Sequence, residues 1–285
     1  MNRIEKIEFI KEKAQRMRCD CIEMGYTAGG HGAHFGPALS CIEEIACLYF
    51  GIMNHDPKNP LMDNRDRFVL SKGHACLSYY AALIEAGYIP NEQMKTFKMD
   101  NSILSGHPGC HPEYGLEVAS GSLGNGFAFS CGMANTAKIK AESHHVFCVM
   151  GDGECNEGVV WEAAMNAVKN KLDHLILIVD RNGFQLAGKT VDIMNVDLEA
   201  VWKAFGWNVK NIADGNDVGS LLTALEEARE TADGKPHVII SNTVKGKGVS
   251  FMENNLAFHA APINQEQYHQ AMKELQQVQI DKGGC

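Results

Sequence analysis

Apolar residues in this chain fall into two alternating patterns, which indicate strands and helices. Residues 146–150 and 175–179 are continuous apolar runs with the length and composition of buried strands. Between them, apolar residues recur at helical spacing from Val159 to Val168. Because strands and helices alternate in this way along the chain, the sequence predicts an α/β fold, a doubly wound parallel sheet flanked by helices. One domain over residues 1–285 is the simplest account.

The rest of the chain shows the same two patterns, with no internal repeat and no low-complexity linker. The first twenty-odd residues are expected to form an amphipathic helix with one apolar stripe, made of Ile4, Ile7, Ile10 and Ala14. Further helices are expected at residues 40–51, 75–86, 126–141, 198–205, 218–231 and 264–282. Further strands are expected at residues 67–71, 207–209 and 237–240.

The most specific polar pattern lies at the ends of the two long apolar runs. Gly151-Asp152-Gly153 follows the first run, and Asn182 follows the second. Parallel strands bring their carboxyl ends to one edge of a sheet, which is where open α/β sheets bind ligands. Asp152 and Asn182 offer the oxygen ligands that Mg²⁺ prefers, and glycines let the backbone approach a phosphate. The tripeptide alone would be explained better by Asp152 capping a helix, but the whole pattern predicts a metal–diphosphate site.

Four histidines lie in expected loops at the ends of strands or helices: His31, His74, His107 and His259. Taken singly, each is more simply explained as a surface residue or as part of a helix terminus. Taken together, and beside a metal–diphosphate motif, they favour a site in which imidazoles transfer protons and hydrogen-bond to sugar or phosphate oxygens.

These segments resemble the transketolase family of thiamine enzymes. The string Gly-Asp-Gly-Glu-Cys-Asn-Glu-Gly-Val-Val-Trp-Glu-Ala, which starts at Gly151, is similar to the family's thiamine-diphosphate motif when it is combined with Asn182. Residues 65–75 are close to the family's strand-to-helix segment. Similar segments run from about residue 20 to about residue 262, which is nearly the whole chain.

The resemblance implies thiamine diphosphate as cofactor, held through Mg²⁺, or through Ca²⁺ or Mn²⁺ in its place. The metal ligands would be Asp152, Asn182 and the backbone carbonyl of Phe184. The other cofactor contacts would come from His74, Gly121, Ser122, Leu123, Gly153 and Glu157. The loop from Gly121 to Leu123 would contact the aminopyrimidine region, Gly153 the diphosphate, and Glu157 would lie at a subunit interface beside the cofactor.

The resemblance also implies catalytic roles toward the substrate for His31, His74, His107 and His259. His111 is a second histidine followed by proline, but the glycine before His107 and its distance to Gly115 favour His107. Three places depart from the family pattern. Residues 33–37 are larger than expected, Arg181 replaces an aromatic or acidic residue, and Ala260 replaces a glycine. None of them removes a metal or diphosphate group.

Composition narrows the class of protein further. The net charge of −9 argues against a general nucleic-acid or anionic-membrane surface. Neither a membrane-length apolar stretch nor a signal peptide is present in the sequence, so we expect a cytoplasmic protein. The ten cysteines are scattered and only Cys19 and Cys21 are closely spaced, which favours buried thiols over disulfides or a structural zinc site.

Full-length transketolases carry a pyrimidine-binding domain and a C-terminal domain beyond the diphosphate-binding one, and 285 residues leave no room for them. The resemblance therefore implies the amino-terminal subunit of a two-chain transketolase. The missing domains, with the glutamate that activates the cofactor, are expected on a partner chain. We expect an α2β2 heterotetramer as the active form and a dimer for this chain alone.

The expected reaction is the reversible transfer of a two-carbon ketol unit from a ketose phosphate to an aldose phosphate. The sequence leaves the sugars open among pentose phosphates, branched sugar phosphates and sulfonated sugars. One alternative is a subunit of another thiamine enzyme, such as a deoxyxylulose-phosphate synthase or a 2-oxo-acid decarboxylase. Another is a non-catalytic binding protein that keeps the cofactor fold.

Overall fold

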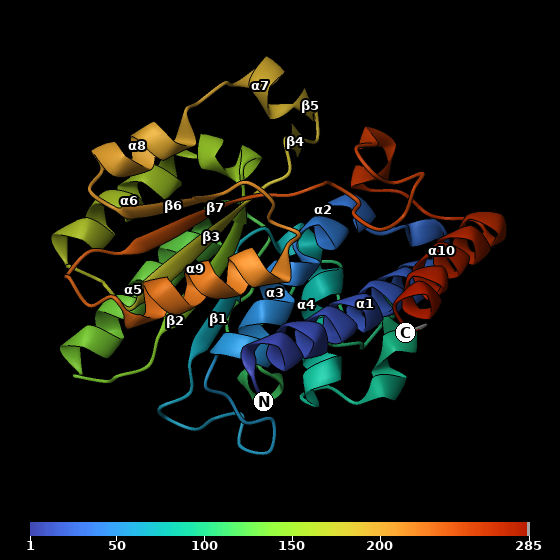
Figure 1. Cartoon of the computed structure of the whole chain (residues 1–285), viewed down its shortest axis with the longest axis horizontal. Coiled ribbons are helices and arrows are strands. Elements are labelled where there is room, and N and C mark those ends of the chain that lie inside the picture. Colours follow the sequence, from blue (N-terminus) through green and yellow to red (C-terminus); the bar gives the residue numbers. More distant parts are fainter. Residues whose placement is uncertain (284–285) are drawn as a thin grey trace.

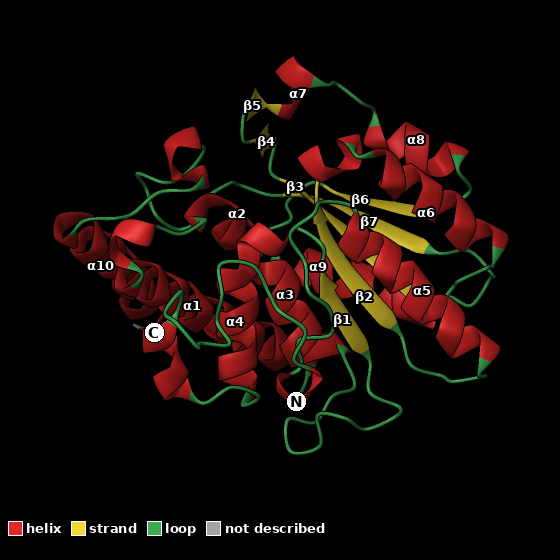
Figure 2. Ribbon diagram, turned by 180° about the vertical axis from the view of Figure 1, so that it is seen from behind, coloured by secondary structure: helices red, strands yellow, loops and turns green. Residues whose placement is uncertain are grey.

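A five-stranded parallel sheet forms the centre of the protein in the computed structural model, which describes residues 1–283 (Figure 2). Its strand order is β1 (Arg67–Leu70), β2 (Val146–Gly151), β3 (Leu175–Arg181), β7 (His237–Asn242) and β6 (Asn208–Ile212). All four neighbouring pairs are parallel. The predicted α/β fold with a parallel sheet is therefore confirmed.

Helices cover both faces of this sheet (Figure 1). One face carries α1 (Arg3–Thr27), α3 (Ile42–Cys47), α4 (Cys76–Ala86) and α9 (Val218–Glu230). The other face carries α5 (Asn125–Ile139), α6 (Gly158–Lys169) and α8 (Leu198–Ala204). The short helix α2 (Phe35–Ser40) precedes α3, and α10 (Gln265–Gly283) packs along α1.

The central strands are buried on both sides, which explains their continuous apolar sequences. In β2, Phe147 and Val149 point into the core under α1, α3, α4 and α9, whereas Cys148 and Met150 point into the core under α5 and α6. Successive side chains of a strand alternate between its faces, so an apolar residue is needed at every position. The strands expected at residues 146–150 and 175–179 are confirmed by this burial.

Two expected elements differ in detail from the structure. The helix expected at residues 40–51 begins earlier, at Phe35, is interrupted at Cys41 and ends in a π-helical turn over Leu48–Ile52. In α1, Ile10 is fully buried but Ile4 is 75 % exposed, so the apolar stripe does not reach the core in the first turn.

One small element was not predicted. After β3 the chain forms a hairpin of β4 (Phe184–Gln185) and β5 (Gly188–Lys189), followed by the single-turn helix α7 (Thr190–Ile193). Two-residue strands carry too little periodicity to be recognised in a sequence. This hairpin stands over the carboxyl edge of the sheet, where it completes the cavity described below.

The expectation that most cysteines are buried thiols is confirmed for the described residues. The nine cysteines of the described residues are free thiols, and seven of them are buried. Among helices of the described residues, none combines the length and the apolar character that crossing a membrane requires.

Candidate functional site

A cavity of about 400 Å³ opens at the carboxyl ends of β2 and β3. Most of the cofactor positions expected from the sequence line it: His74, Gly121, Leu123, Asp152, Gly153, Glu157, Asn182 and Phe184. His259 lines it as well, together with three side chains to which the sequence analysis gave no role, His34, Lys72 and Lys245. Residues from seven separate segments of the chain therefore meet at this edge of the sheet.

The Asp152 carboxylate is held in one orientation at the end of β2. Its Oδ1 accepts a hydrogen bond from the Gly153 amide (3.0 Å), and its Oδ2 accepts from the Gly183 amide (3.0 Å) and the Thr190 hydroxyl (3.2 Å). Burial, and then the nearby Asp180 carboxylate, raise the pKa of Asp152 to about 6. A buried, fixed carboxylate beside a second one is a place where a cation would be stabilising.

Asn182 lies at the end of the neighbouring strand, 7 % exposed. Its Nδ2 donates to Asp180 Oδ2 (2.9 Å), and its Oδ1 accepts from the Phe184 amide (3.1 Å). Hydrogen bonds on both sides fix which way the amide faces, and Oδ1 keeps a second lone pair. The carboxylate and amide oxygens of this site are therefore pre-oriented before any ligand binds.

The donor set suits a magnesium ion that is shared with a diphosphate. No group of three histidine, cysteine or acidic side chains with metal-binding geometry occurs among the described residues. Mg²⁺ commonly takes one or two carboxylates from the protein and its remaining oxygens from phosphates and water. Next to Asp152, a Cβ on Gly153 would lie 2.9 Å from the Gln185 Cβ, so the close approach of these two segments requires glycine.

The part of the cavity that contains Asp152 and Asn182 is called the metal end here. Glu154 connects it to the loop that begins at Gly121. Its fully buried carboxylate accepts from the amides of Gly124 (2.7 Å) and Gly151 (3.1 Å) and from the Ser71 hydroxyl. The loop expected to contact the aminopyrimidine is thus tied to the end of β2. Of its residues, Gly121 and Leu123 line the cavity, whereas Ser122 does not and bonds Asn125 instead.

The other end of the cavity is a cluster of histidines centred on His34. The ring centroid of His34 lies 5.5 Å from that of His74, 5.8 Å from His107 and 5.7 Å from His259. Burial, followed by the charges of neighbouring groups, lowers the pKa of His34 and of His259 to about 4. Burial and the Lys72 charge also lower the pKa of His74. These imidazoles are therefore neutral at physiological pH.

The expected histidine of the glycine turn, His31, lies outside this cluster. Its side chain is exposed, and its backbone carbonyl accepts a hydrogen bond from Lys98 Nζ (3.2 Å). Ala33 forms a two-way backbone bridge with Ala261, at 3.0 Å in each direction, which brings the next residue, His34, beside the His259 segment. This pairing of distant segments decides which of the two histidines points inward.

The positions of His107 and His111 in the structure can be compared directly. His107 is exposed and does not line the cavity, but its ring contacts that of His34. His111 forms a backbone bridge with Leu116 and lies 3.5 Å from the Glu113 carboxylate. Only His107 of this pair belongs to the histidine cluster.

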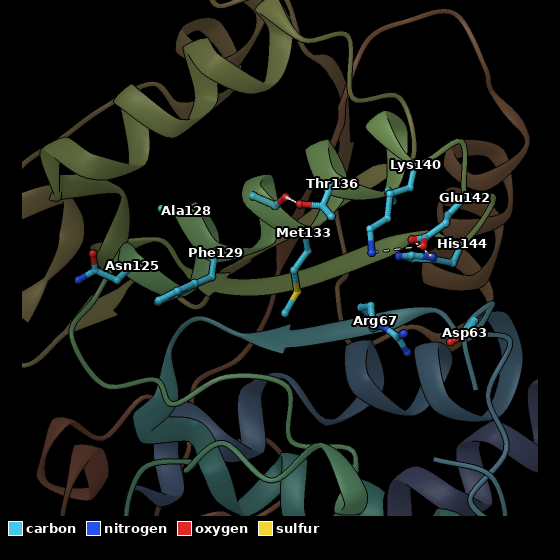
Figure 3. A pocket seen from close by; sticks show the side chains of 12 residues that line it. Asp63, Arg67, Asn125, Ala128, Phe129, Met133, Thr136, Lys140, Glu142 and His144 are labelled. Carbon is cyan, nitrogen blue, oxygen red and sulfur yellow. Dashed lines mark hydrogen bonds and ion pairs between the residues drawn. The ribbon is translucent and has the colours of Figure 1, made fainter. Parts of the chain in front are cut away.

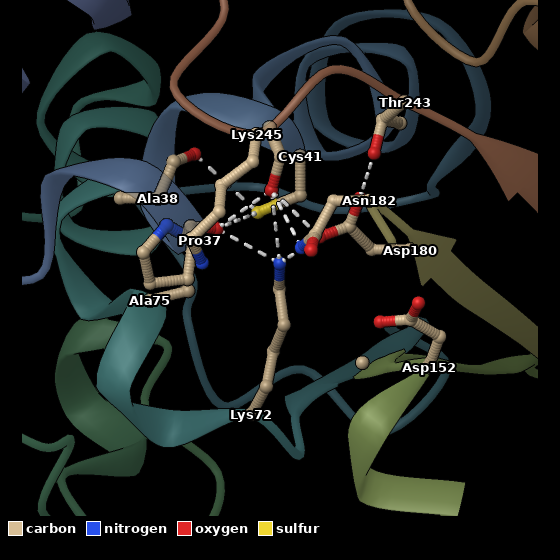
Figure 4. Close-up of polar contacts among 12 residues, drawn as sticks. Pro37, Ala38, Cys41, Lys72, Ala75, Asp152, Asp180, Asn182, Thr243 and Lys245 are labelled. Carbon is tan, nitrogen blue, oxygen red and sulfur yellow. Dashed lines mark hydrogen bonds and ion pairs between the residues drawn. The ribbon is translucent and has the colours of Figure 1, made fainter. Parts of the chain in front are cut away.

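Two buried lysines complete the site. Lys72 forms an ion pair with Asp180 and donates to the Pro37 carbonyl (2.8 Å), as Figure 4 shows. Lys245 Nζ lies 3.2 Å from His259 Nδ1. Burial, and then the charge of Lys72, lower the pKa of Lys245 to about 8. Each lysine follows the carboxyl end of a strand, β1 or β7. That position in the sequence could have marked both as candidate site residues.

A larger hollow, of about 710 Å³, lies elsewhere, along α5 (Figure 3). It is lined by the exposed Phe129, by Met133 and by charged side chains such as Arg67 and Lys140. None of the site residues expected from the sequence lines it. The cavity at the carboxyl edge is therefore the stronger candidate site in spite of its smaller volume.

The fold and this cavity define an α/β protein with a candidate ligand site at the carboxyl edge of a parallel sheet. Residues 12–279 match the family described as transketolase, thiamine diphosphate binding domain. The chain belongs to the transketolase family.

Its relatives fall into two groups by length. It is 41 % identical over 266 residues to a chain named as one of the subunits of apulose-4-phosphate transketolase in Actinobacillus succinogenes, covering 93 % of this chain and 94 % of that one. It is 42 % identical to "6-deoxy-6-sulfo-D-fructose transketolase subunit SqwG" of Clostridium sp. strain MSTE9, covering 85 % and 88 %. The solved transketolase of Campylobacter jejuni superposes with a TM-score of 0.87 at 32 % identity, over 97 % of this chain but 43 % of that one.

Proposed function

We propose that this chain is the thiamine-diphosphate-binding subunit of a two-chain transketolase, which transfers a two-carbon ketol unit reversibly from a ketose phosphate to an aldose phosphate. The observation that carries the proposal is one cavity that joins a pre-oriented metal–diphosphate end to a cluster of neutral histidines. Relatives that are named transketolase subunits and are similar to this chain over most of their length support the two-chain form.

The metal end would bind the cofactor. Asp152, Asn182 and the Phe184 carbonyl would hold Mg²⁺, the backbone of Gly153 would contact the diphosphate, and His74 and the loop from Gly121 would contact the thiamine rings. Bound thiamine diphosphate supplies the thiazolium carbon and the electron sink for carbon–carbon bond cleavage. The chain's own contribution at this end is to orient the cofactor and to compensate its charge.

The histidine end would bind the substrate. A neutral imidazole donates a hydrogen bond from one nitrogen and accepts one at the other, so the cluster can hold sugar hydroxyls and move protons at the reacting carbonyl. We assign these hydrogen-bonding and proton-transfer roles to His34, His74 and His259, with His107 at the rim. His34 replaces His31 in this assignment because it is the histidine of that turn that lines the cavity.

The partner would supply the pyrimidine-binding and C-terminal domains, including the glutamate that activates the cofactor. Glu157 lines the cavity and is exposed, which suits a position beside a second chain. The active form is proposed to be an α2β2 heterotetramer. The similar chains named for apulose 4-phosphate and 6-deoxy-6-sulfofructose make branched sugar phosphates and sulfonated sugars the first donors to test, before pentose phosphates.

The test is to purify the chain together with the product of the neighbouring transketolase-like reading frame. Ketol transfer is then measured with ketose phosphates, and with pyruvate as the alternative donor. We expect transfer only when both chains, thiamine diphosphate and Mg²⁺ are present. Turnover by this chain alone would refute the two-chain form. Pyruvate-dependent turnover would favour a deoxyxylulose-phosphate synthase or a decarboxylase, and absence of cofactor binding would favour a non-catalytic protein.

A further inference from the structure

We propose that Asp180, which is not one of the candidate metal ligands, is the positioning residue of the metal end: it sets the direction of the Asn182 amide and anchors the backbone of Asp152. The inference rests on the proposed function, because it concerns how the candidate metal ligands are held. Its basis is a buried group of polar contacts beneath the cavity, drawn in Figure 4.

Four donors from four separate segments converge on the Asp180 carboxylate. Its Oδ2 accepts hydrogen bonds from the Ser40 hydroxyl (2.6 Å) and from Asn182 Nδ2 (2.9 Å), and it pairs with the Lys72 ammonium. Its Oδ1 accepts from the Thr243 hydroxyl. The segments are α2, the end of β1, the end of β3 and the end of β7. Asp180 is fully buried, so these contacts are not exchanged with water.

These contacts determine which atom of Asn182 is left for a metal. An ionised carboxylate only accepts hydrogen bonds, so Asn182 has to present its NH₂ group to Asp180. The carbonyl oxygen of the amide then points the other way. It bonds the Phe184 amide and keeps one lone pair for a cation. If Asp180 were replaced by a group that can also donate, the amide could turn over and present nitrogen to the metal.

Asp180 also reaches the second candidate ligand through its main chain. The Asp152 amide donates to the Asp180 carbonyl oxygen (3.2 Å), at the last paired position between β2 and β3. One residue is thus bonded to the side chain of Asn182 and to the backbone of Asp152, the two residues whose side chains would bind the metal. Residues that orient metal ligands in this way typically change metal affinity by about 10- to 100-fold when they are replaced.

The simpler explanation is that Lys72 and Asp180 form a buried ion pair that serves stability alone. The chain offers a matched comparison, because Arg65 and Glu117 form another ion pair with side chains only 3 % and 7 % exposed. Neither of these residues lines the cavity. A change that only breaks a buried pair should lower thermal stability at both places, whereas the positioning role adds a loss of metal affinity at Asp180.

The experiment titrates thiamine diphosphate into the full-length chain by calorimetry at a series of Mg²⁺ concentrations, and measures thermal unfolding without ligand. We expect Asp180→Asn to weaken the Mg²⁺ dependence of cofactor binding by about 10- to 100-fold, with binding restored at high Mg²⁺. The control Glu117→Gln should lower the unfolding temperature but leave the Mg²⁺ dependence unchanged. Equal Mg²⁺ dependence in Asp180→Asn and wild type, or an equal loss in Glu117→Gln, would overturn the inference.

Two milder variants cover the case in which Asp180→Asn does not fold. Ser40→Ala and Thr243→Val each remove one hydroxyl donor from the carboxylate, and each should weaken the Mg²⁺ dependence by about 2- to 10-fold. Wild-type behaviour of both would overturn the positioning role. If the wild-type chain binds no thiamine diphosphate at any Mg²⁺ concentration, the proposed function fails together with the inference. If wild type binds and all variants bind equally well, only the inference fails.

Discussion

The two ends of the cavity are built from different kinds of contact. At the metal end, Asp152 and Asn182 follow consecutive paired strands. Backbone amides hold both side chains, together with the Thr190 hydroxyl and the Asp180 carboxylate. At the histidine end, His34, His74 and His259 come from segments far apart in the sequence, and their rings contact one another. The candidate metal ligands therefore lie on one strand–helix–strand unit, whereas the histidines come together only after distant loops have packed.

This difference has a functional consequence. Asp152 and Asn182 are held by amides of their own strand ends and by Asp180, so changes in the loops that carry the histidines should leave the metal end intact. A cluster of rings depends on every neighbouring segment, so its residues can change with the substrate while the cofactor end stays the same. Variants at each end of the cavity distinguish the two kinds of construction.

The largest effect is expected for Asp152→Ala at the metal end. This change removes the only carboxylate among the candidate ligands, so Mg²⁺ loses its anionic protein ligand and the diphosphate loses the cation that would compensate its charge. We expect calorimetry to detect no Mg²⁺-dependent binding of thiamine diphosphate, while the fold stays intact. Thr190→Val is the matched control, because it removes one hydrogen bond to Asp152 and should cost about 2- to 10-fold. Unchanged affinity in Asp152→Ala would remove the metal assignment.

A large effect on catalysis alone is expected for His34→Gln. With the partner chain supplied, kcat/KM should fall by about 10²- to 10⁴-fold, because a proton-transferring or hydrogen-bonding imidazole is lost from the cavity. Cofactor affinity should stay close to wild type. His31→Gln, three residues earlier in the same turn, should leave kcat/KM nearly unchanged because its side chain is exposed. Steady-state kinetics with the opposite ranking would restore His31 as the substrate-facing residue.

A smaller effect is expected at the rim of the histidine cluster. His107→Ala should lower kcat/KM by roughly tenfold, as for one lost hydrogen bond to a polar substrate. His111→Ala should be tolerated, because that ring faces Glu113 and takes no part in the cluster. The same kinetic assay distinguishes the two, and a dead His111 variant beside a normal His107 variant would mean that this loop is wrongly assigned.

The smallest effect is a dependence of stability on pH. Folding lowers the pKa of His34 and His259 to about 4, below the ordinary value of 6.5. Between these values the unfolded state binds more protons than the folded state, so the free energy of unfolding falls as pH falls from about 6.5 toward 4. Above about pH 7 these two histidines do not change the free energy of unfolding with pH. Lys98 and Lys245 face the cluster and oppose its protonation.

The measurement compares wild type with His34→Gln by denaturant unfolding at pH 7.5 and pH 5. The decrease in the free energy of unfolding at pH 5 that is linked to His34 is on the order of 1 kcal/mol, after allowance for solvent screening at a partly exposed ring. The variant should lack that part of the loss. Groups away from the cluster, including Asp152, change both proteins alike, so the difference reports His34 together with its effect on the neighbouring His74 and His259. Identical losses in the two proteins would mean that His34 titrates normally in the folded state.

Much of the fold and of the metal end could be predicted from the sequence. The apolar runs of β2 and β3 need a sheet covered on both faces, and the polar residues directly after them have to lie at its carboxyl edge. The position of Asp152 and Asn182 at this edge therefore follows from their place in the sequence alone. Neither the β4–β5 hairpin nor the interruption at Cys41 could be predicted, because such short segments carry no periodicity.

The histidine end and the buried lysines were decided by tertiary structure. His31 and His34 stand in one glycine-rich turn, and the sequence holds no signal for which of them faces inward. The backbone bridge between Ala33 and Ala261 decides it, and that contact joins opposite ends of the chain. Likewise, Lys72 has a role only because folding places Asp180 beside it. The periodicity of apolar residues shows which face of a helix or strand is buried. It does not show which distant segments come into contact, because those contacts form only when the whole sheet and its loops have assembled.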